Sequence, residues 1–272
     1  MRLFLGFRLF SAFLKNEPEG RLIEKKQRHL TLLFLGEVEK AQIEPLFFQL
    51  PLPDLAIAPT GYFDKLLFLP FFHPRVVAGR LVFFNPSQFS RELEQYRRKV
   101  QAFFSGHGLV PEGKRKFLAH TAFARYPFQK KAWKKAFEPF PVILTSFHLF
   151  QSLGGLYQPL VSKVFLPPFE ELKNQTAPAF LIRGHNFEEL KRNAEMALAF
   201  QHPPLLAYLN HKKVSSLEEV ILALNDLIYR LELKDGSPFK AIAFHTKLSE
   251  KKYPPPTAEG RSFWEWEMLV DI

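Results

Sequence analysis

Short apolar segments alternate with polar loops over the first 150 residues of the chain. They are five to ten residues long and rich in β-branched or aromatic side chains, which is typical of β-strands. We therefore expect strands over residues 2–10, 29–35, 65–69, 75–84, 120–125 and 142–150.

Three further segments have apolar residues at the three- and four-residue spacing of an amphipathic helix. Each follows a residue that favours a helix N-terminus: Ser90 before 91–104, Asn186 before 187–200, and Ser216 before 217–233. The two segments 241–248 and 263–270 predict a strand, a loop and a strand. Because helices and strands do not alternate in strict βαβ order, the expected fold class is α+β.

Pro167 and Pro168, followed by the polar stretch 170–175, predict a boundary between two domains. We place this boundary near residue 173. The sequence thus predicts one domain over residues 1–172 and a smaller one over residues 175–272.

The positive charge of the chain lies in its first part. Residues 1–174 hold 25 Lys and Arg against 14 acidic residues, whereas the remainder holds 12 against 13. The net charge of +10 therefore comes from the first domain, with basic clusters at 114–116 and 130–135. Such a surface is expected to attract a polyanion.

The sequence contains no cysteine, which excludes disulfides, thiolate chemistry and Cys-type zinc sites. Its apolar runs are broken by Arg, Lys, His or Pro before they reach the roughly 20 residues of a membrane helix. Arg8 interrupts the apolar N-terminal run, which we therefore interpret as a buried strand and not as a signal peptide. We expect a globular protein of a reducing compartment, by default the cytoplasm, without a membrane partner.

The segment RHLTLLFLGE places His29 and Thr31 two residues apart in a strand pattern. Residues at this spacing project from the same face of a strand. An imidazole can transfer protons near neutral pH, and a neighbouring hydroxyl can donate to a phosphoryl oxygen. The pair is thus a candidate for phosphate chemistry.

A second histidine, His120, opens another short apolar strand 91 residues later. With both histidines, residues 1–168 resemble the bacterial and archaeal RNA 2′,3′-cyclic phosphodiesterases. This group was long called the 2′-5′ RNA ligases and belongs to the two-histidine phosphoesterase superfamily. The resemblance rests on MRLFLGF, HLTLLFLGEV, GYFDKLLFLPFFHPRVVAGRLVF, HTAFAR, and LTSFHLFQS before GLYQPLVSKVFLP.

The resemblance implies a bilobal fold in which each lobe contributes one catalytic histidine to a cleft, with nitrogens roughly 5 to 8 Å apart. The implied reaction is hydrolysis of an RNA 2′,3′-cyclic phosphate end to a 2′-phosphate, without metal or other cofactor. By this analogy His120 is the base that activates water and His29 the acid that protonates the departing ribose oxygen. Thr31 and Arg125 would bind the phosphate.

Two departures from the family pattern concern the site. The family has a threonine two residues after the second histidine, where this chain has Ala122 and carries Thr121 instead. Thr121 is a substrate-binding candidate only if a bulge intervenes, because strand alternation otherwise turns it away from the cleft. In addition, the segment between residues 10 and 29 is too short for the family's first helix and contains Pro18 and Gly20.

Residues 175–272 resemble archease, the protein that activates the tRNA-splicing RNA ligase, in FEELKRNAEMALAF, LNDLIYRLELKDGSPFKAIAF and FWEWEMLVDI. Archeases bind a divalent metal through separated aspartates, of which Asp271 alone remains here. The other two motif positions read TAPA at 176–179 and ILA at 221–223. The resemblance therefore implies a degenerate archease-like α+β module without a metal site, and a tRNA-splicing RNA ligase as a candidate partner.

Three functions are compatible with these features. The first is metal-independent hydrolysis of RNA 2′,3′-cyclic phosphate ends, with such an RNA as the partner. The second is a catalytically impaired RNA-end-binding protein that recruits or regulates a tRNA-splicing RNA ligase, which the loss of the second threonine and of the aspartates would favour. The third is a phosphodiesterase for a small cyclic nucleotide.

Overall fold

The computed structural model describes residues 1–12, 18–83, 89–110, 117–173, 177–210, 212–244, 247–253 and 262–272, without the side chains of residues 89 and 90. The chain forms two compact units. The first comprises Met1–Asp54, Gly61–Glu138 and Val142–Phe165, and the second comprises Leu55–Thr60, Pro139–Pro141 and Leu166–Ile272. Both units contain helices and strands that do not alternate regularly, so the expected α+β class is confirmed.

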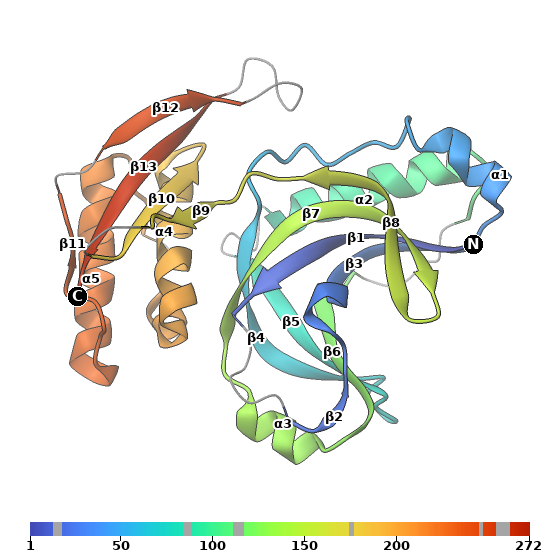
Figure 1. The fold of residues 1–272 in the computed structure, drawn as a ribbon, viewed down its shortest axis with the longest axis horizontal. Helices are drawn as coiled ribbons and strands as arrows, with labels where there is room; N and C mark the ends of the chain where they lie inside the picture. Colours follow the sequence, from blue (N-terminus) through green and yellow to red (C-terminus); the bar gives the residue numbers. More distant parts are fainter. Residues whose placement is uncertain are drawn as a thin grey trace. The chain divides into compact units, whose positions relative to one another are not determined.

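All six strands expected in the first part of the chain are present, with small shifts of their ends (Figure 1). The strands of the first unit are β1 (Arg2–Ser11), β2 (Gly20–Leu22), β3 (His29–Glu37), β4 (Thr60–Leu69), β5 (Val76–Phe83), β6 (His120–Phe128), β7 (Phe140–Leu153) and β8 (Leu156–Val164). Its helices are α1 (Lys40–Ile43), α2 (Phe89–Gly106) and α3 (Lys130–Ala136), with 3-10 turns at Lys25–Gln27 and Glu44–Leu46.

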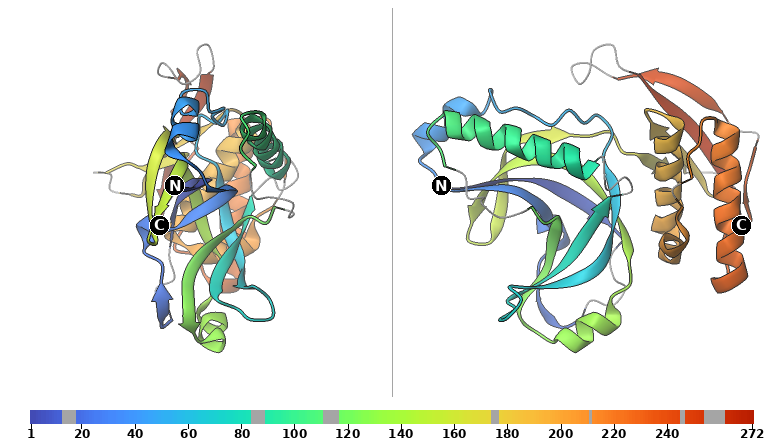
Figure 2. Two further views of the ribbon diagram at one scale, coloured as in Figure 1. Left: turned by 90° about the vertical axis from the view of Figure 1, so that its right-hand side faces the viewer. Right: turned by 180° about the vertical axis from the view of Figure 1, so that it is seen from behind.

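These strands form one sheet in the order β2-β6-β5-β4-β7-β1-β3, with β8 paired to β7. Strand β7 therefore connects two sets of strands, one containing β3 and the other containing β6. Alternate residues of β1 and β7 are buried on one face of the sheet, among them Leu5 and Phe147. Helix α2 covers this face, where the ring of Tyr96 meets that of Phe147 edge to face at 5.5 Å (Figure 2).

The segment between β1 and β3, which the sequence predicts to be too short for the family's first helix, contributes a strand. Strand β2 pairs antiparallel with β6, with Arg21 opposite Arg125. It extends the sheet beside β6 and is followed by the 3-10 turn that leads into β3.

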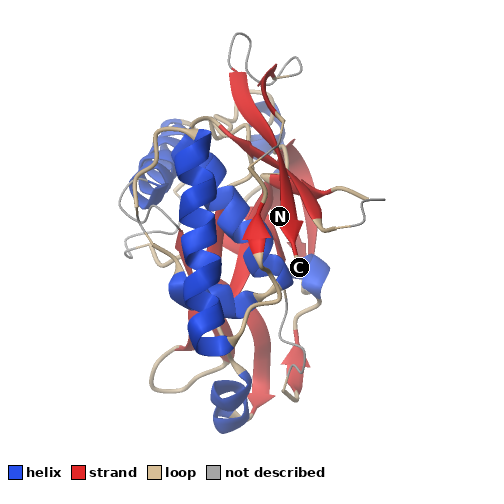
Figure 3. Cartoon of the chain, turned by 90° about the vertical axis from the view of Figure 1, so that its left-hand side faces the viewer, coloured by secondary structure: helices blue, strands red, loops and turns tan. Residues whose placement is uncertain are grey.

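The second unit is a smaller sheet with two long helices. Its elements are β9 (Phe169–Glu171), β10 (Ala179–Gly184), α4 (Phe187–Gln201), a 3-10 helix at Pro203–Tyr208, α5 (Leu217–Asp235), β11 (Ala241–Ile242), β12 (Leu248–Lys252) and β13 (Ser262–Asp271). The strand order is β11-β13-β10-β9, and β12 pairs with β13. Figure 3 shows α5 beside these strands. In the part of the chain that is described, no helix is long and apolar enough to cross a membrane.

The helix ends of the second unit follow the sequence prediction. The Asn186 side chain accepts a hydrogen bond from the Glu189 amide at 2.9 Å, and Ser216 accepts one from the Glu219 amide at 3.2 Å. Both predicted N-caps are therefore confirmed, whereas the predicted cap Ser90 lies outside the residues whose side chains are described. The prediction of one strand over 241–248 was wrong in its extent. This stretch contains β11 and the start of β12, which pair separately with two parts of β13.

A segment from early in the chain completes the second unit. Ile57 is buried in one cluster with Tyr253 and Phe263 and forms a parallel bridge with Leu166. The hydroxyl of Thr60 donates a hydrogen bond to Asn193 of α4 at 3.1 Å. The first and the last stretch of the second unit are therefore more than 100 residues apart in the sequence.

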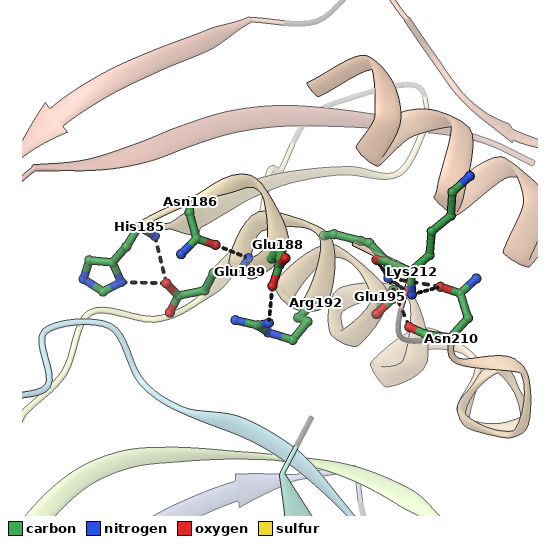
Figure 4. A network of polar contacts seen from close by, with 9 residues as sticks. His185, Asn186, Glu188, Glu189, Arg192, Glu195, Asn210 and Lys212 are labelled. Carbon is green, nitrogen blue, oxygen red and sulfur yellow. Dashed lines mark hydrogen bonds and ion pairs between the residues drawn. The ribbon is translucent and has the colours of Figure 1, made fainter. Parts of the chain in front are cut away.

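Helix α4 buries charged side chains (Figure 4). The ammonium of Lys191 lies 3.4 Å from Glu195 and donates hydrogen bonds to two oxygens of Asn210 and to the carbonyl of Lys212, each at 3.1 Å. The two side chains are 4% and 1% exposed, so the attraction between them acts in a medium of low polarity. Burial raises the pKa of Glu195 to about 7, and Lys191 opposes this rise.

Candidate functional site

His29 and His120 occupy equivalent places in the first unit. His29 is the first residue of β3 and His120 is the first residue of β6, and the two strands lie against each other. Arg28, which is almost completely buried, donates to the Ile23 carbonyl at 2.9 Å. Its guanidinium lies 5.4 Å from the ring centre of Phe123 in β6. This contact joins the beginning of β3 to the other histidine-bearing strand.

Both imidazole rings are oriented by the same local hydrogen bond. His29 Nδ1 lies 2.8 Å from the carbonyl oxygen of Gln27, and His120 Nδ1 lies 2.7 Å from that of Leu118. A carbonyl oxygen only accepts hydrogen bonds, so Nδ1 is the protonated nitrogen of each neutral ring. In both histidines Nε2 is therefore the nitrogen that can accept or donate a proton.

Aromatic rings surround His29. The ring centres of Phe4, Phe150 and Tyr157 lie 4.8, 5.8 and 4.5 Å from its own. Burial lowers the pKa of His29 to about 4, and the positive charges of His120, Arg125 and Arg8 contribute to this shift. At neutral pH the ring is therefore uncharged in the free protein.

Thr31 and Arg8 flank His29 on the sheet. Arg8 of β1 is paired with His29, and Gly6 is paired with Thr31, so alternation places these side chains on one face. A Cβ atom at Gly6 would lie 2.6 Å from the carbonyl oxygen of Leu30. Glycine therefore permits the close approach of β1 to β3 beneath the predicted phosphate ligand Thr31.

Arg125 extends from β6 towards the same place. Its guanidinium donates to the Tyr157 hydroxyl at 3.4 Å, and the Tyr157 ring meets His29 edge to face. The Tyr157 amide in turn donates to the side chain of Gln27 at 2.9 Å. The predicted phosphate ligand Arg125 is thus linked to the predicted acid His29 through one tyrosine.

The residues after His120 lie as strand alternation predicts. Ala122 is partly exposed, whereas Thr121 is fully buried and its hydroxyl has no hydrogen-bond partner among the described residues. A shift in the pairing of β5 and β6 does occur, but it falls after Ala122 and leaves the direction of Thr121 unchanged. The Thr121 hydroxyl is therefore not available to a ligand in this conformation.

Arg8, Gln27 and Tyr157 were missed by the sequence prediction. Arg8 carried a usable signal, because it is a cation at a position that shares a strand face with Phe4 and Gly6. Gln27 and Tyr157 are 130 residues apart in the sequence. No local pattern predicts that they meet.

His148 lies on the same sheet. It is paired with Gly6 and is 5% exposed. Its ring nitrogens contact the hydroxyls of Ser146 at 2.6 Å and Ser162 at 2.7 Å. Burial lowers the pKa of His148 to about 4, with a further contribution from Arg8. Because the ring is neutral and both of its nitrogens are hydrogen-bonded to serines, His148 has a structural role in the sheet.

In the second unit, Asp271 is the last residue of β13 and is exposed. The preceding residue, Val270, donates its amide to the carbonyl of Pro178 at 2.9 Å, which places the altered motif at 176–179 beside it. Thr176 itself lies outside the described residues. Among the residues that are described, no three His, Cys, Asp or Glu side chains gather as metal ligands would.

No family model matches the chain, and no curated protein matches it. Among solved structures, it is similar to TT0787 of Thermus thermophilus with 19% identity and a TM-score of 0.44, covering 61% of this chain and 98% of that one. A protein described as a phosphoesterase has 23% identity and a TM-score of 0.43, with the same coverage. LigT of E. coli in its apo form has 21% identity and a TM-score of 0.43, and the match covers 61% of this chain and 97% of LigT.

Proposed function

We propose that the first unit hydrolyses RNA 2′,3′-cyclic phosphate ends to terminal 2′-phosphates without a metal ion. The observation that carries this proposal is the matched pair of imidazoles on β3 and β6, each with Nδ1 bound to a carbonyl and Nε2 left for proton transfer. Hydrolysis of a cyclic phosphate needs one base and one acid, and two such rings supply both.

In the proposed step, water is the nucleophile and the ribose O3′ is the leaving group. Nε2 of His120 takes a proton from the water as its oxygen bonds to phosphorus. The bond from phosphorus to O3′ breaks, and Nε2 of His29 gives a proton to O3′. The phosphate remains on O2′, and the charge that develops on its oxygens is stabilised by Arg125, Arg8 and the Thr31 hydroxyl.

The low pKa of His29 has a consequence for this assignment. With a pKa of about 4, Nε2 of His29 holds no proton at neutral pH in the free protein, and the ring keeps only the proton on Nδ1. A bound phosphodiester is an anion, and an anion beside an imidazole raises the imidazole pKa. In our proposal His29 is therefore protonated when the substrate binds.

Ala122 and Thr121 favour a second candidate function, that of an impaired protein that binds RNA ends. The position beside His120 has no hydroxyl, and the neighbouring Thr121 is buried. Loss of one donor to the phosphate can cost about 10²-fold in rate. In this alternative the protein recruits or regulates a tRNA-splicing RNA ligase instead of hydrolysing the end itself.

For the second unit we propose an archease-like module with such a ligase as its partner. The support comes from the sequence motifs at 187–200 and 224–244 and from the terminal FWEWEMLVDI. The phosphodiesterase consumes 2′,3′-cyclic phosphate ends, and an archease-assisted ligase acts on the same ends. This agreement rests on the likeness to two families.

An assay of two substrates tests the proposed function. The purified protein is incubated with an oligoribonucleotide that ends in a 2′,3′-cyclic phosphate and, separately, with a 2′,3′-cyclic mononucleotide. We expect the oligonucleotide to gain one water and to become a 2′-phosphate, as read by mass spectrometry. Preference for the mononucleotide would support a small-nucleotide phosphodiesterase, and binding without hydrolysis would support the impaired protein.

A further inference from the structure

Two phenylalanines are exposed at the turn between β4 and β5. Phe71 and Phe72 are 82% and 84% exposed, and their rings meet edge to face with centres 5.3 Å apart. Tyr126, near the end of β6, is 67% exposed. Large aromatic side chains that gather on a surface indicate a binding site more often than isolated ones do.

Backbone and ring contacts bring these aromatic residues together. The Arg75 amide donates to the Leu69 carbonyl at 2.8 Å, and the Tyr126 amide donates to the Arg75 carbonyl at 2.9 Å. The ring of Phe128 lies 6.1 Å from Phe68 and 6.3 Å from Tyr126. The turn and the end of β6 therefore form one surface, here called the hairpin surface, which consists of Phe68, Phe71, Phe72, Tyr126 and Phe128.

Helix α3 follows β6 and places lysines at the same end of the first unit (Figure 2). Trp133 is buried and fixes the helix to the unit, while the four lysines of α3 are exposed. Within the described part of the chain, Lys130, Lys131, Lys134 and Lys135 form no ion pair. The ammonium of Lys130 lies 5.9 Å from the ring centre of Phe68, so the lysines and the aromatic rings are neighbours.

The charge of this region is of one sign. Residues 65–83 and 117–137 contain no Asp or Glu, whereas together they contain eight Lys and Arg. One of these, Arg80, is paired with Asp64. The other seven form no ion pair with an acidic residue in the described part of the chain, and so can meet a ligand with several negative charges.

We propose that the hairpin surface and the lysines of α3 bind single-stranded RNA. Bases stack on exposed aromatic faces whatever their sequence, and lysines neutralise the phosphates between them. An acidic peptide would satisfy the lysines but would leave the aromatic faces without a planar partner. The inference rests on the proposed function, because Arg125 of the candidate site directly precedes Tyr126 of the hairpin surface in β6, so an RNA with its end at the site would have this surface within reach.

Fluorescence anisotropy with a single-stranded oligoribonucleotide of about twelve nucleotides tests this proposal. The oligonucleotide ends in a 3′-hydroxyl, so it is not a substrate. We expect Phe71→Ala/Phe72→Ala to weaken binding about tenfold, at the lower end of what stacking of one or two bases contributes. Lys131→Glu/Lys134→Glu should weaken binding and also lower the dependence of affinity on salt. Phe48→Ala is the matched control, because Phe48 is fully exposed elsewhere in the first unit.

The results distinguish RNA binding by the hairpin surface from hydrolysis at the candidate site. The aromatic variant should hydrolyse a 2′,3′-cyclic mononucleotide as the wild type does. RNA binding that is unchanged in Phe71→Ala/Phe72→Ala, after a melting curve shows the variant folded, would overturn the proposal. Binding to phosphatidylserine vesicles that needs Phe71 and Phe72, without binding to RNA, would also overturn it and would assign the surface to a membrane. If RNA binding depends on the surface but no substrate is hydrolysed, the surface stands and the proposed function fails.

Discussion

His29 and His120 present the same nitrogen, Nε2, because each ring gives Nδ1 to the carbonyl oxygen two residues before it in the chain. The arrangement is local in both cases, because each hydrogen bond joins residues two apart in the chain. It also makes the two rings chemically interchangeable in the neutral state. The surroundings of the two rings differ, since aromatic rings enclose His29, and in the proposed reaction this difference would decide which ring is the acid.

The first prediction concerns the two histidines. His29→Ala and His120→Ala should each lower turnover of a cyclic-phosphate RNA end by about 10²-fold or more, because each removes one proton transfer. RNA affinity should change little, since cations dominate binding to the backbone. His107→Ala is the control, because His107 is exposed, directly follows α2, and among the described residues its side chain is hydrogen-bonded to the Phe103 carbonyl. Wild-type turnover by His29→Ala would show that His29 is not the acid of the reaction.

The second prediction concerns the missing hydroxyl. Ala122→Thr should raise turnover if the wild type is impaired, because residue 122 is partly exposed next to His120 and the new hydroxyl could donate to the phosphate. Ala122→Val is the matched control, as valine has nearly the shape of threonine without the hydroxyl. An equal gain in both variants would show that side-chain volume, and not the donor, is responsible.

The third prediction concerns the protonation of His29. Its imidazole should titrate near pH 4 in NMR spectra of the free protein, and it should be neutral above about pH 5. Because Arg8 contributes to the low pKa, Arg8→Met should raise the midpoint, whereas Arg2→Met at the exposed start of the same strand should not. Inorganic phosphate should also raise it. A midpoint above about pH 6 in the free wild type would show that burial does not lower the pKa of His29.

The fourth prediction concerns the buried pair Lys191 and Glu195. Lys191→Met leaves a buried carboxylate without its partner, and it should lower the free energy of unfolding by about 3 to 5 kcal/mol at pH 8. Lys251→Met, in a half-exposed pair with Glu265, should cost less than about 1 kcal/mol. Urea unfolding of the whole chain, followed at the second unit's tryptophans, measures both. If both variants lost the same free energy of unfolding, burial of the Lys191–Glu195 pair would not explain its contribution to stability.

The same pair predicts a dependence of stability on pH. The pKa of Glu195 is raised to about 7 in the folded protein, well above its ordinary value, so the folded state binds the extra proton. This contribution to stability is present at low pH and is lost as the pH rises towards and through 7. Glu195→Gln should remove it, and the difference in unfolding midpoint between pH 6 and pH 8 should shrink for the second unit. A difference that stays as large as in the wild type would assign the effect to other groups.

The sequence predicted those parts of the site that depend on strand periodicity. The position of His29 on the same strand face as Thr31, and the opposite direction of Thr121 where no bulge precedes it, both follow from the two-residue repeat of a strand. Tyr157 could not be predicted, since its contacts with Gln27 and Arg125 join three separate strands or turns. Strand β8 was missed for a related reason: it is largely exposed and contains Pro159, so its apolar pattern is weak.

The segment Leu55–Thr60 determines how the protein can be divided experimentally. Because this segment belongs to the second unit, no single cut in the chain yields both units intact. A fragment that begins at residue 175 would lack Ile57 and would expose Tyr253 and Phe263 to water. It would also lack β9, leaving the edge of β10 open to pairing with other molecules. Such a fragment is expected to aggregate, and its failure to bind a ligase would say nothing about the second unit in the whole protein.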